Sequence, residues 1–284
     1  MRRSHPFFLI AVLAAGLCAA GFRNIPYLSA DEVMQKVKDT QAADAEIDYI
    51  RMTTVSSSGE AVTREFISVV QKDTKGDSFY LMRFLAPDDE KGTSLLVTEK
   101  EGAEAEQYLY LPALGKPKKI EGSGRAGNFM GSDFTFEDLR KEKVGEWKYD
   151  RLEDESVEGT DCYVIMATPA DKSREKITGY TYRFLYVDKA NFVIRRIELL
   201  DSKHVITKVF DAQDYQPANN GTQRPRSGVM TNKVKNTHTI MTLLNTRLNQ
   251  PVDEKFFTLD TIQHWGPDQE KLVTDLKPAP AKSP

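Results

Sequence analysis

Side chains suited to catalysis or metal binding are few in this chain and lie far apart in the sequence. Beyond the first 20 residues the histidines are His204, His238 and His264. None of them forms an H-x-x-x-H pair or stands at a recurring metal-ligand spacing from a cysteine or a carboxylate. The G-x-S-x-G pattern of serine esterases is also missing from the sequence. We therefore expect no enzyme, no metal site and no cofactor, and we assign surface or structural roles to the three histidines.

The glycines at 122, 124 and 127 match the letters of the dinucleotide-binding fingerprint G-x-G-x-x-G. That fingerprint binds a cofactor only where it opens a long helix within a βαβ unit, which is not expected here. Glycine also allows positive φ and a close approach of the backbone to other groups. We interpret this run as a loop.

Most of the chain is predicted to form β-strands. Runs rich in β-branched and aromatic residues alternate with short turns, a spacing typical of an antiparallel meander. Ser29 followed by Glu32 fits a capping box and predicts a helix that reaches about Ala43. The fold class is therefore mainly β. The expected strands cover residues 46–56, 61–72, 78–86, 94–99, 105–111, 118–120, 146–152, 161–168, 178–187, 192–200, 204–214, 227–235 and 238–247.

The stretch YLYLPALGKPKKIEGSGRAGNFMGSDFTFEDL, residues 108–139, organises the prediction. It begins as a strand and continues into four glycines within ten residues, which surround the apolar pair Phe129 and Met130. Ser132, or the aspartate after it, is placed to cap a short helix. Marginal order combined with an apolar inner side is typical of a lid. We therefore expect residues 122–139 to gate a cavity.

Alternation within the strands places aromatic residues together on one face. In the expected strand 178–187 the even-numbered positions from 180 to 186 are aromatic, and those of 78–86 include Met82 and Phe84. An ordinary sandwich core is one explanation of this pattern. A curved sheet around a cavity is the other, and the many flat rings and the few helices favour it.

Three stretches of the sequence resemble a known family. They are YLPALGKPKKI…GNFMGSDFTFEDL, RFLAPDDEKGTSLLV at 83–97 and MTLLNTRLNQPVDEKFFT at 241–258. In this order they are similar to the signature of the outer-membrane lipoprotein-sorting proteins, a LolA-like family of periplasmic lipid and lipoprotein carriers. The resemblance extends over about residues 80 to 258.

This resemblance implies a curved antiparallel sheet that forms an incomplete, half β-barrel, with short helices as a lid. It also implies a carrier that binds lipid or lipoprotein acyl chains and transfers them towards the outer membrane. The implied partners are a lipid or an acylated lipoprotein and an inner-membrane transporter. The ligand-contacting residues are expected to be Met82, Phe84, Tyr108, Tyr110, Tyr182 and Phe184. The lid residues are expected to be Phe129, Met130, Phe134 and Phe136.

The N-terminus is typical of an exported protein. Residues 1–20 combine two arginines, an apolar run and a Cys-Ala-Ala cleavage site, so they are predicted to be a cleaved signal peptide. A lipid anchor on Cys18 is the alternative, but Leu17 stands where a lipobox requires a small residue. The expected protein is periplasmic, with one domain over 21–276 and a disordered tail at 277–284.

Charge and cysteine content agree with export. Removing residues 1–20 takes away two arginines and no acid, so the formal charge falls from −3 to −5. A mildly acidic protein is a poor partner for nucleic acid. Cys162 is the only cysteine after residue 20, so no intramolecular disulfide can form, and its apolar surroundings in sequence predict a buried, inert thiol.

Two other functions compete with the carrier. A lipid-binding sensor, or an accessory subunit of a membrane transporter, would have the same fold and a partner whose affinity changes with lipid loading. A lipid-acting hydrolase is the least favoured, because the sequence shows no nucleophile paired with a base.

Overall fold

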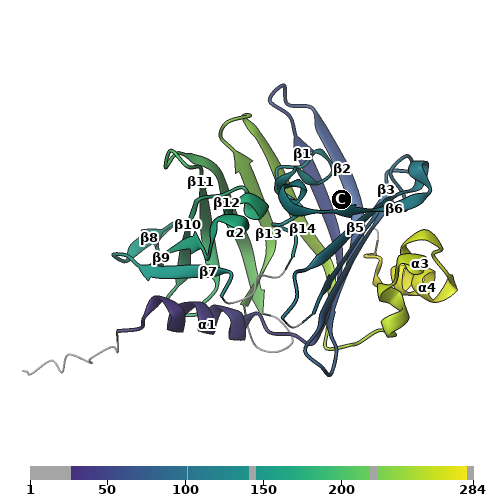
Figure 1. Ribbon diagram of the computed structural model, residues 1–284, viewed down its shortest axis with the longest axis horizontal. Coiled ribbons are helices and arrows are strands. Elements are labelled where there is room, and N and C mark those ends of the chain that lie inside the picture. Colours follow the sequence, from purple (N-terminus) through teal and green to yellow (C-terminus); the bar gives the residue numbers. More distant parts are fainter. Residues whose placement is uncertain (1–26, 101, 141–144, 218–222, 280–284) are drawn as a thin grey trace, which may run out of the picture.

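The computed structural model describes residues 27–100, 102–140, 145–217 and 223–279 of the chain. The expected signal peptide with Cys18 and residues 280–284 of the tail lie outside these ranges. Within them, one antiparallel sheet of 14 strands dominates the molecule, accompanied by a few short helices (Figure 1). The mainly β prediction is confirmed.

Most strands begin and end within two residues of the predicted positions. The strands are β1 (Ala45–Val55), β2 (Ala61–Lys72), β3 (Ser78–Ala86), β4 (Ser94–Glu99), β5 (Glu106–Leu111), β6 (Lys116–Ile120), β7 (Trp147–Arg151), β8 (Glu155–Val157), β9 (Thr160–Pro169), β10 (Tyr182–Asp188), β11 (Ile194–Leu200), β12 (Ile206–Pro217), β13 (Gln223–Asn232) and β14 (Thr237–Leu248).

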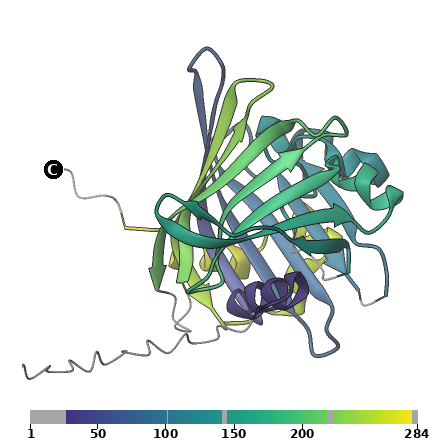
Figure 2. The ribbon, with the colours of Figure 1, turned by 90° about the vertical axis from the view of Figure 1, so that its left-hand side faces the viewer.

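The sheet consists of two meanders that meet in its middle. Strands β6 to β1 follow one another in space, β1 pairs with β14, and β14 leads through β13 to β9 and β7. The two ends of this path, β6 and β7, do not pair with each other, so the sheet does not close. Its strands twist and curve around a common interior (Figures 1 and 2). The predicted half-barrel is confirmed.

The register distinguishes the two faces of the sheet. Met82 on β3 pairs with Leu95 on β4, which pairs with Leu109 on β5, so these three side chains share a face. We call it the inner face. The side chains of Leu81 and Leu96 lie on the opposite, outer face.

Helix α1 (Ala30–Thr40) covers the inner face of β7, β9 and β10. Its capping box is formed as predicted, with Ser29 and Glu32 exchanging hydrogen bonds. Val33 and Val37 are buried among inner-face side chains such as Ile165 and Leu185.

Three C-terminal elements that the sequence analysis did not foresee cover the outer face. They are η4 (Glu254–Phe257), α3 (Leu259–Gln263) and α4 (Pro267–Leu276), and α3 and α4 stand outside the curve of the sheet in Figure 1. Phe257, Ile262 and Leu276 pack against outer-face residues of β1 to β4. Arg83 stacks on Trp265 with 4.5 Å between its guanidinium carbon and the ring centre. In the described part of the chain, no helix has both the length and the apolar character needed to cross a membrane.

Two local predictions were wrong. The strand expected at 178–187 begins only at Tyr182, because α2 (Lys172–Thr178) precedes it; Asp171 caps this helix and Gly179, at φ +75°, ends it. The helix expected after Ser132 does not form either. Residues 122–140, which we call the central segment, make the short turns η2 (Gly122–Ala126) and η3 (Phe129–Gly131) and then irregular structure.

Candidate functional site

The inner face carries a continuous layer of large apolar side chains. On β1 to β5 the layer includes Met52, Phe66, Phe84 and Leu95, all fully buried. Phe66 and Phe84 stack with 5.6 Å between ring centres. The layer continues across β11 to β14, and its members there are Ile197, Leu199, Phe210, Met230 and Met241. A surface of this kind requires a cover, because exposing it to water is costly.

The central segment is that cover. Phe129 meets Phe84 edge to face at 5.7 Å and Phe136 at 5.4 Å. Farther along, Phe134 meets Phe210 at 6.1 Å. The segment therefore fills the interior of the half-barrel with its own phenylalanines, and it spans both meanders.

A buried aspartate fastens the middle of the central segment to the sheet. Asp133 accepts hydrogen bonds from Thr237 at 2.6 Å and from Thr239 at 3.0 Å, and its own backbone N–H donates to Thr239 at 2.9 Å. Lys208 donates through Nζ to the Asp133 carbonyl at 2.7 Å and to the Tyr180 hydroxyl at 3.2 Å. These bonds end on β12 and β14, so they fix the segment to the second meander.

A buried ionic cluster holds the end of the central segment. Arg140 bonds to Glu137 on the segment, to Glu99 on β4 at 3.1 Å and to Glu146 before β7. Arg174 on α2 joins the same cluster, at 3.0 Å from Glu146 and also bonded to Glu137. Because the cluster joins the central segment to β4, to the residue before β7 and to α2, we call it the Arg140 cluster and interpret it as a latch.

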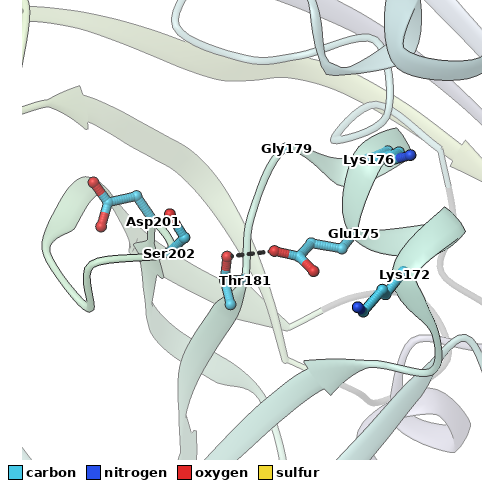
Figure 3. Close-up of a pocket in the computed structure, with 7 residues that line it drawn as sticks. All are labelled: Lys172, Glu175, Lys176, Gly179, Thr181, Asp201 and Ser202. Atoms are coloured by element: carbon cyan, nitrogen blue, oxygen red, sulfur yellow. Dashed lines mark hydrogen bonds between the residues drawn. The ribbon is translucent and has the colours of Figure 1, made fainter.

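Two small cavities lie near α2, and one of them borders the central segment. One, of about 230 Å³, lies between the segment and β12–β13; it is lined by Ala126, Asn128, Thr135, Thr178, Gly179, Tyr180, Thr207, Lys208, Asn232, Val234 and Lys235. The other, of about 380 Å³, lies between α2 and the β11–β12 turn, where Glu175 accepts a hydrogen bond from Thr181 at 2.8 Å (Figure 3). Polar groups line much of both cavities, so neither is the apolar ligand cavity expected from the sequence.

Comparison with known proteins identifies the family. A family model described only as an uncharacterized protein matches residues 76–264. A solved domain from Vibrio parahaemolyticus, assigned to the outer membrane lipoprotein-sorting proteins, is 26% identical with a TM-score of 0.76, over 82% of this chain and 97% of that one. The chain belongs to the LolA-like family.

Two further solved structures share the LolA-like fold. A DUF1329 family protein from Desulfovibrio piger is 23% identical with a TM-score of 0.76, over 81% of this chain and 96% of that one. A LolA superfamily protein from Nitrosomonas europaea is 17% identical with a TM-score of 0.66, over 82% of this chain and 99% of that one. No curated protein matches the sequence.

Of the six residues that were predicted to contact ligand, two lie on the inner face and four on the outer face. Met82 and Phe84 lie on the inner face of the LolA-like sheet, beneath Phe129. Phe134 and Phe136 are buried with them as part of the cover. Met130, half-buried, packs against the same cluster, so the four predicted lid residues do gather over the inner face.

The other four residues lie on the wrong face for that role. Tyr108 pairs with Leu96, and Tyr110 shares its face, so both belong to the outer layer beneath α3 and α4. Tyr182 and Phe184 also point outward. They alternate along β10 with Leu185, which faces inward and pairs with Ile197 on β11. Half-exposed tyrosines are favourable on an outer face, since their rings pack while their hydroxyls reach water.

The sequence analysis missed several inner-face residues, of which Phe210 is the most instructive. Its ring lies over Gly228, where an added Cβ would come within 2.6 Å of two ring atoms. Glycine in a strand is a signal for such a close approach. Gly228 thus allows Phe210 to reach Phe134 in the LolA-like interior.

Gly228→Ala is therefore expected to destabilise the protein by about 1–3 kcal/mol, because the ring must move out of its position over the strand. Chemical denaturation measures this loss. Gly124→Ala is the comparison without a clash, because an added Cβ there would meet Ile120 at an ordinary contact distance of 3.6 Å and, as at Gly228, φ is not positive. If Gly228→Ala is as stable as the wild-type protein, Phe210 does not depend on that glycine.

Burial raises the pKa of Glu137 to about 7, even though Arg140 lowers it. A carboxyl whose pKa is higher in the folded state than in the unfolded state binds more protons when folded. Its contribution to stability is therefore full below about pH 4.5 and falls as the pH rises towards 7.

We expect Glu137→Gln to reduce the loss of stability between pH 5 and pH 8, by at most about 3 kcal/mol. The measurement is the free energy of unfolding of both proteins across that range. Parallel curves for the variant and the wild-type protein would show that Glu137 stays ionised throughout.

Neither cysteine nor metal chemistry is evident at this site. Cys162 is fully buried, and burial raises the pKa of its thiol. Among the described residues, no group of three histidine, cysteine or acidic side chains could hold a metal ion.

Proposed function

We propose that this LolA-like chain is a non-enzymatic periplasmic carrier that binds lipid or lipoprotein acyl chains on its inner face and transfers them towards the outer membrane. The observation that carries the proposal is the central segment itself. A short, irregular piece of chain, and not a regular helix layer, covers the large apolar inner face with Phe129, Phe134 and Phe136.

A mobile cover of this kind suits a ligand that replaces it. In the described conformation the phenylalanines occupy the interior, so an acyl chain must displace them to reach Phe84 and Met241. Burying one methylene is worth about 0.8 kcal/mol, so an acyl chain of ~15 carbons contributes roughly 12 kcal/mol. That energy offsets the exposure of three aromatic rings. We infer that the segment is closed without ligand and lifts when the ligand enters.

The direction of transfer would follow from relative affinities. A donor such as an inner-membrane transporter needs only to hold the ligand less tightly than the carrier, and an acceptor needs to hold it more tightly. No covalent step is required. The family membership supports lipid or lipoprotein as the ligand class, because the Vibrio relative is assigned to lipoprotein sorting.

The test compares charges placed on the two faces. Met241 lies on the inner face and Phe184 on the outer face, and both are half-buried, so a glutamate at either is comparably tolerated. We expect Met241→Glu to weaken binding of a fluorescent fatty-acyl probe at least roughly tenfold, because the carboxylate must be desolvated beside the chain. Phe184→Glu should bind normally.

Circular dichroism establishes that both variants keep the sheet. Loss of binding in Phe184→Glu but not in Met241→Glu would move the ligand to the outer face. If the wild-type protein binds no acyl probe and natively purified protein yields no lipid by mass spectrometry, the carrier proposal is overturned.

A further inference from the structure

One polar side chain lies within the apolar inner layer without a partner. Gln107 on β5 is 0% exposed, and neither its Nε2 nor its Oε1 has a hydrogen-bond partner. Among the described residues it is the one side chain with two unpaired buried polar atoms. A buried amide without partners costs stability, and a leucine or methionine of similar size would avoid that cost.

The register places Gln107 on the inner face, under the central segment. It pairs with Val97 on β4 and with Ile120 on β6. Both belong to the cluster that contains Phe129 and Phe136. The amide is therefore buried on the surface that an acyl chain would occupy once the segment lifts.

Another buried glutamine shows how this protein satisfies such a group. Gln71 donates from Nε2 to the Val252 carbonyl at 3.1 Å and accepts from the Val252 N–H at 2.8 Å. Its amide thus bonds the N–H and the C=O of one residue, which belong to the two peptide groups on either side of that residue's Cα. Gln107 offers the same donor and acceptor, with no such N–H and C=O opposite them.

A second unpaired donor lies in the same corner of the interior. Arg125, buried on the central segment, donates through Nη2 to the carbonyl of Ala105, two residues before Gln107 on β5. Its Nε has no partner. Three unpaired polar atoms, two of Gln107 and one of Arg125, therefore lie close together beneath the central segment.

We propose that Gln107 recognises an amide group in the ligand, so that the preferred ligand is an amide-linked acyl chain. This inference rests on the proposed carrier function. An N-acylated amino acid presents the N–H of its acyl amide to Oε1 and its own carboxyl oxygen to Nε2, the same N–H and C=O of one residue that Gln71 bonds in Val252. An ester presents acceptors alone, which would leave Oε1 unsatisfied. Gln107 therefore selects the linkage, while the phenylalanine layer binds the chain.

The experiment uses two matched probes that differ in one atom, N-dodecanoylglycine and its ester analogue O-dodecanoylglycolate. They share chain length and carboxylate charge. Binding of each to the full-length mature protein is measured by displacement of a fluorescent acyl probe. We expect the wild-type protein to bind the amide roughly tenfold more tightly than the ester, as one well-made buried hydrogen bond would give.

Gln107→Met should remove this preference, so that both probes bind with equal affinity, and should raise the thermal midpoint, because the unpaired amide is gone. Gln107→Leu is the second variant and should behave alike. Gln71→Met is the matched control: it should lower the midpoint and keep the preference.

The outcomes separate the inference from the function it rests on. Equal binding of both probes by the wild-type protein overturns the role of Gln107 and leaves the carrier proposal standing. A preference that persists in both Gln107 variants also overturns it. If neither probe binds the wild-type protein, the carrier proposal fails, and the inference fails with it.

Discussion

Oxidation of a protein that carries both Asp133→Cys and Thr239→Cys is expected to abolish binding of an acyl-chain probe, and a reductant is expected to restore it. The disulfide would fasten the central segment to β14 at the place where Asp133 now bonds Thr239. Almost none of the cross-linked protein can then adopt the open conformation that the ligand requires. The apparent affinity falls in proportion to the fraction of protein that can open. We expect a loss of at least about 100-fold.

The geometry of the pair allows the cross-link. The backbone nitrogen of Asp133 lies 2.9 Å from Oγ1 of Thr239. Adding the covalent distances to each Cα gives a separation of at most ~7 Å, at the upper end of the range that disulfides span. Cys162 is fully buried and should not compete for oxidation.

Each single cysteine variant is the control for the lost hydrogen bonds, and each should bind the probe under both conditions. Mass spectrometry confirms the cross-link. A cross-linked protein that binds the probe as tightly as its reduced form would show that the central segment is a fixed plug and that ligands bind elsewhere.

Replacing Arg140 with methionine is expected to cost about 3–5 kcal/mol of stability at pH 8. Arg140 is the cation that bonds Glu99, Glu137 and Glu146 together, and its side chain is 2% exposed. Without it three carboxylates face one another in the interior, with Arg174 bonded to two of them. Uncompensated buried charge is among the most destabilising changes a protein can undergo.

The same variant should release the end of the central segment. Amides at residues 127–136 are expected to lose hydrogen-exchange protection, while those of β10 keep theirs. Lowering the pH to 5 should recover part of the stability, because Glu137, whose pKa is raised by burial, can then take up a proton.

Arg51→Met is the matched control, since the Arg51–Glu65 pair lies on the surface and should contribute less than about 1 kcal/mol. An Arg140 variant as stable as Arg51→Met would mean that the cluster does not act as a latch.

The sequence predicted the strands well because turns and alternation are local signals. Residues 61–72, 78–86 and 94–99 were bounded correctly by glycines and a proline nearby. The half-barrel came from the family resemblance, and the 14-stranded open sheet confirms it.

The orientation of each strand was harder to predict, because a shift of one residue exchanges the faces. Treating the aromatic face as the inner one was right for β3, where Met82 and Phe84 are buried. It was wrong for β5 and β10, where tyrosines cover the outer face and aliphatic Leu185 points inward. Aromatic content alone does not distinguish a buried face from a half-exposed one.

The remaining missed features are of two kinds, one visible in the local sequence and one that depends on tertiary contacts. Asp171 and Gly179 bracket α2 and could have been recognised as helix caps. By contrast, nothing local marks Gln107 as unpaired or Arg140 as the centre of a cluster. The cluster around Arg140 includes Glu99 and Arg174, each more than 30 positions away, and Gln107 is buried by pairing between strands and by the central segment.

The open edges of the sheet carry a mechanical consequence. The chain leaves the first meander at β6 and enters the second at β7, so the central segment is tied to both edges that the sheet leaves unpaired. We expect flattening of the sheet to move these edges apart and to pull the phenylalanines of the central segment off the inner face. When the sheet curves again, the edges approach each other and the rings can return to the inner face. Widening of the interior and removal of its cover are then a single motion, which thermal bending of the sheet can drive without a separate hinge or a chemical energy source.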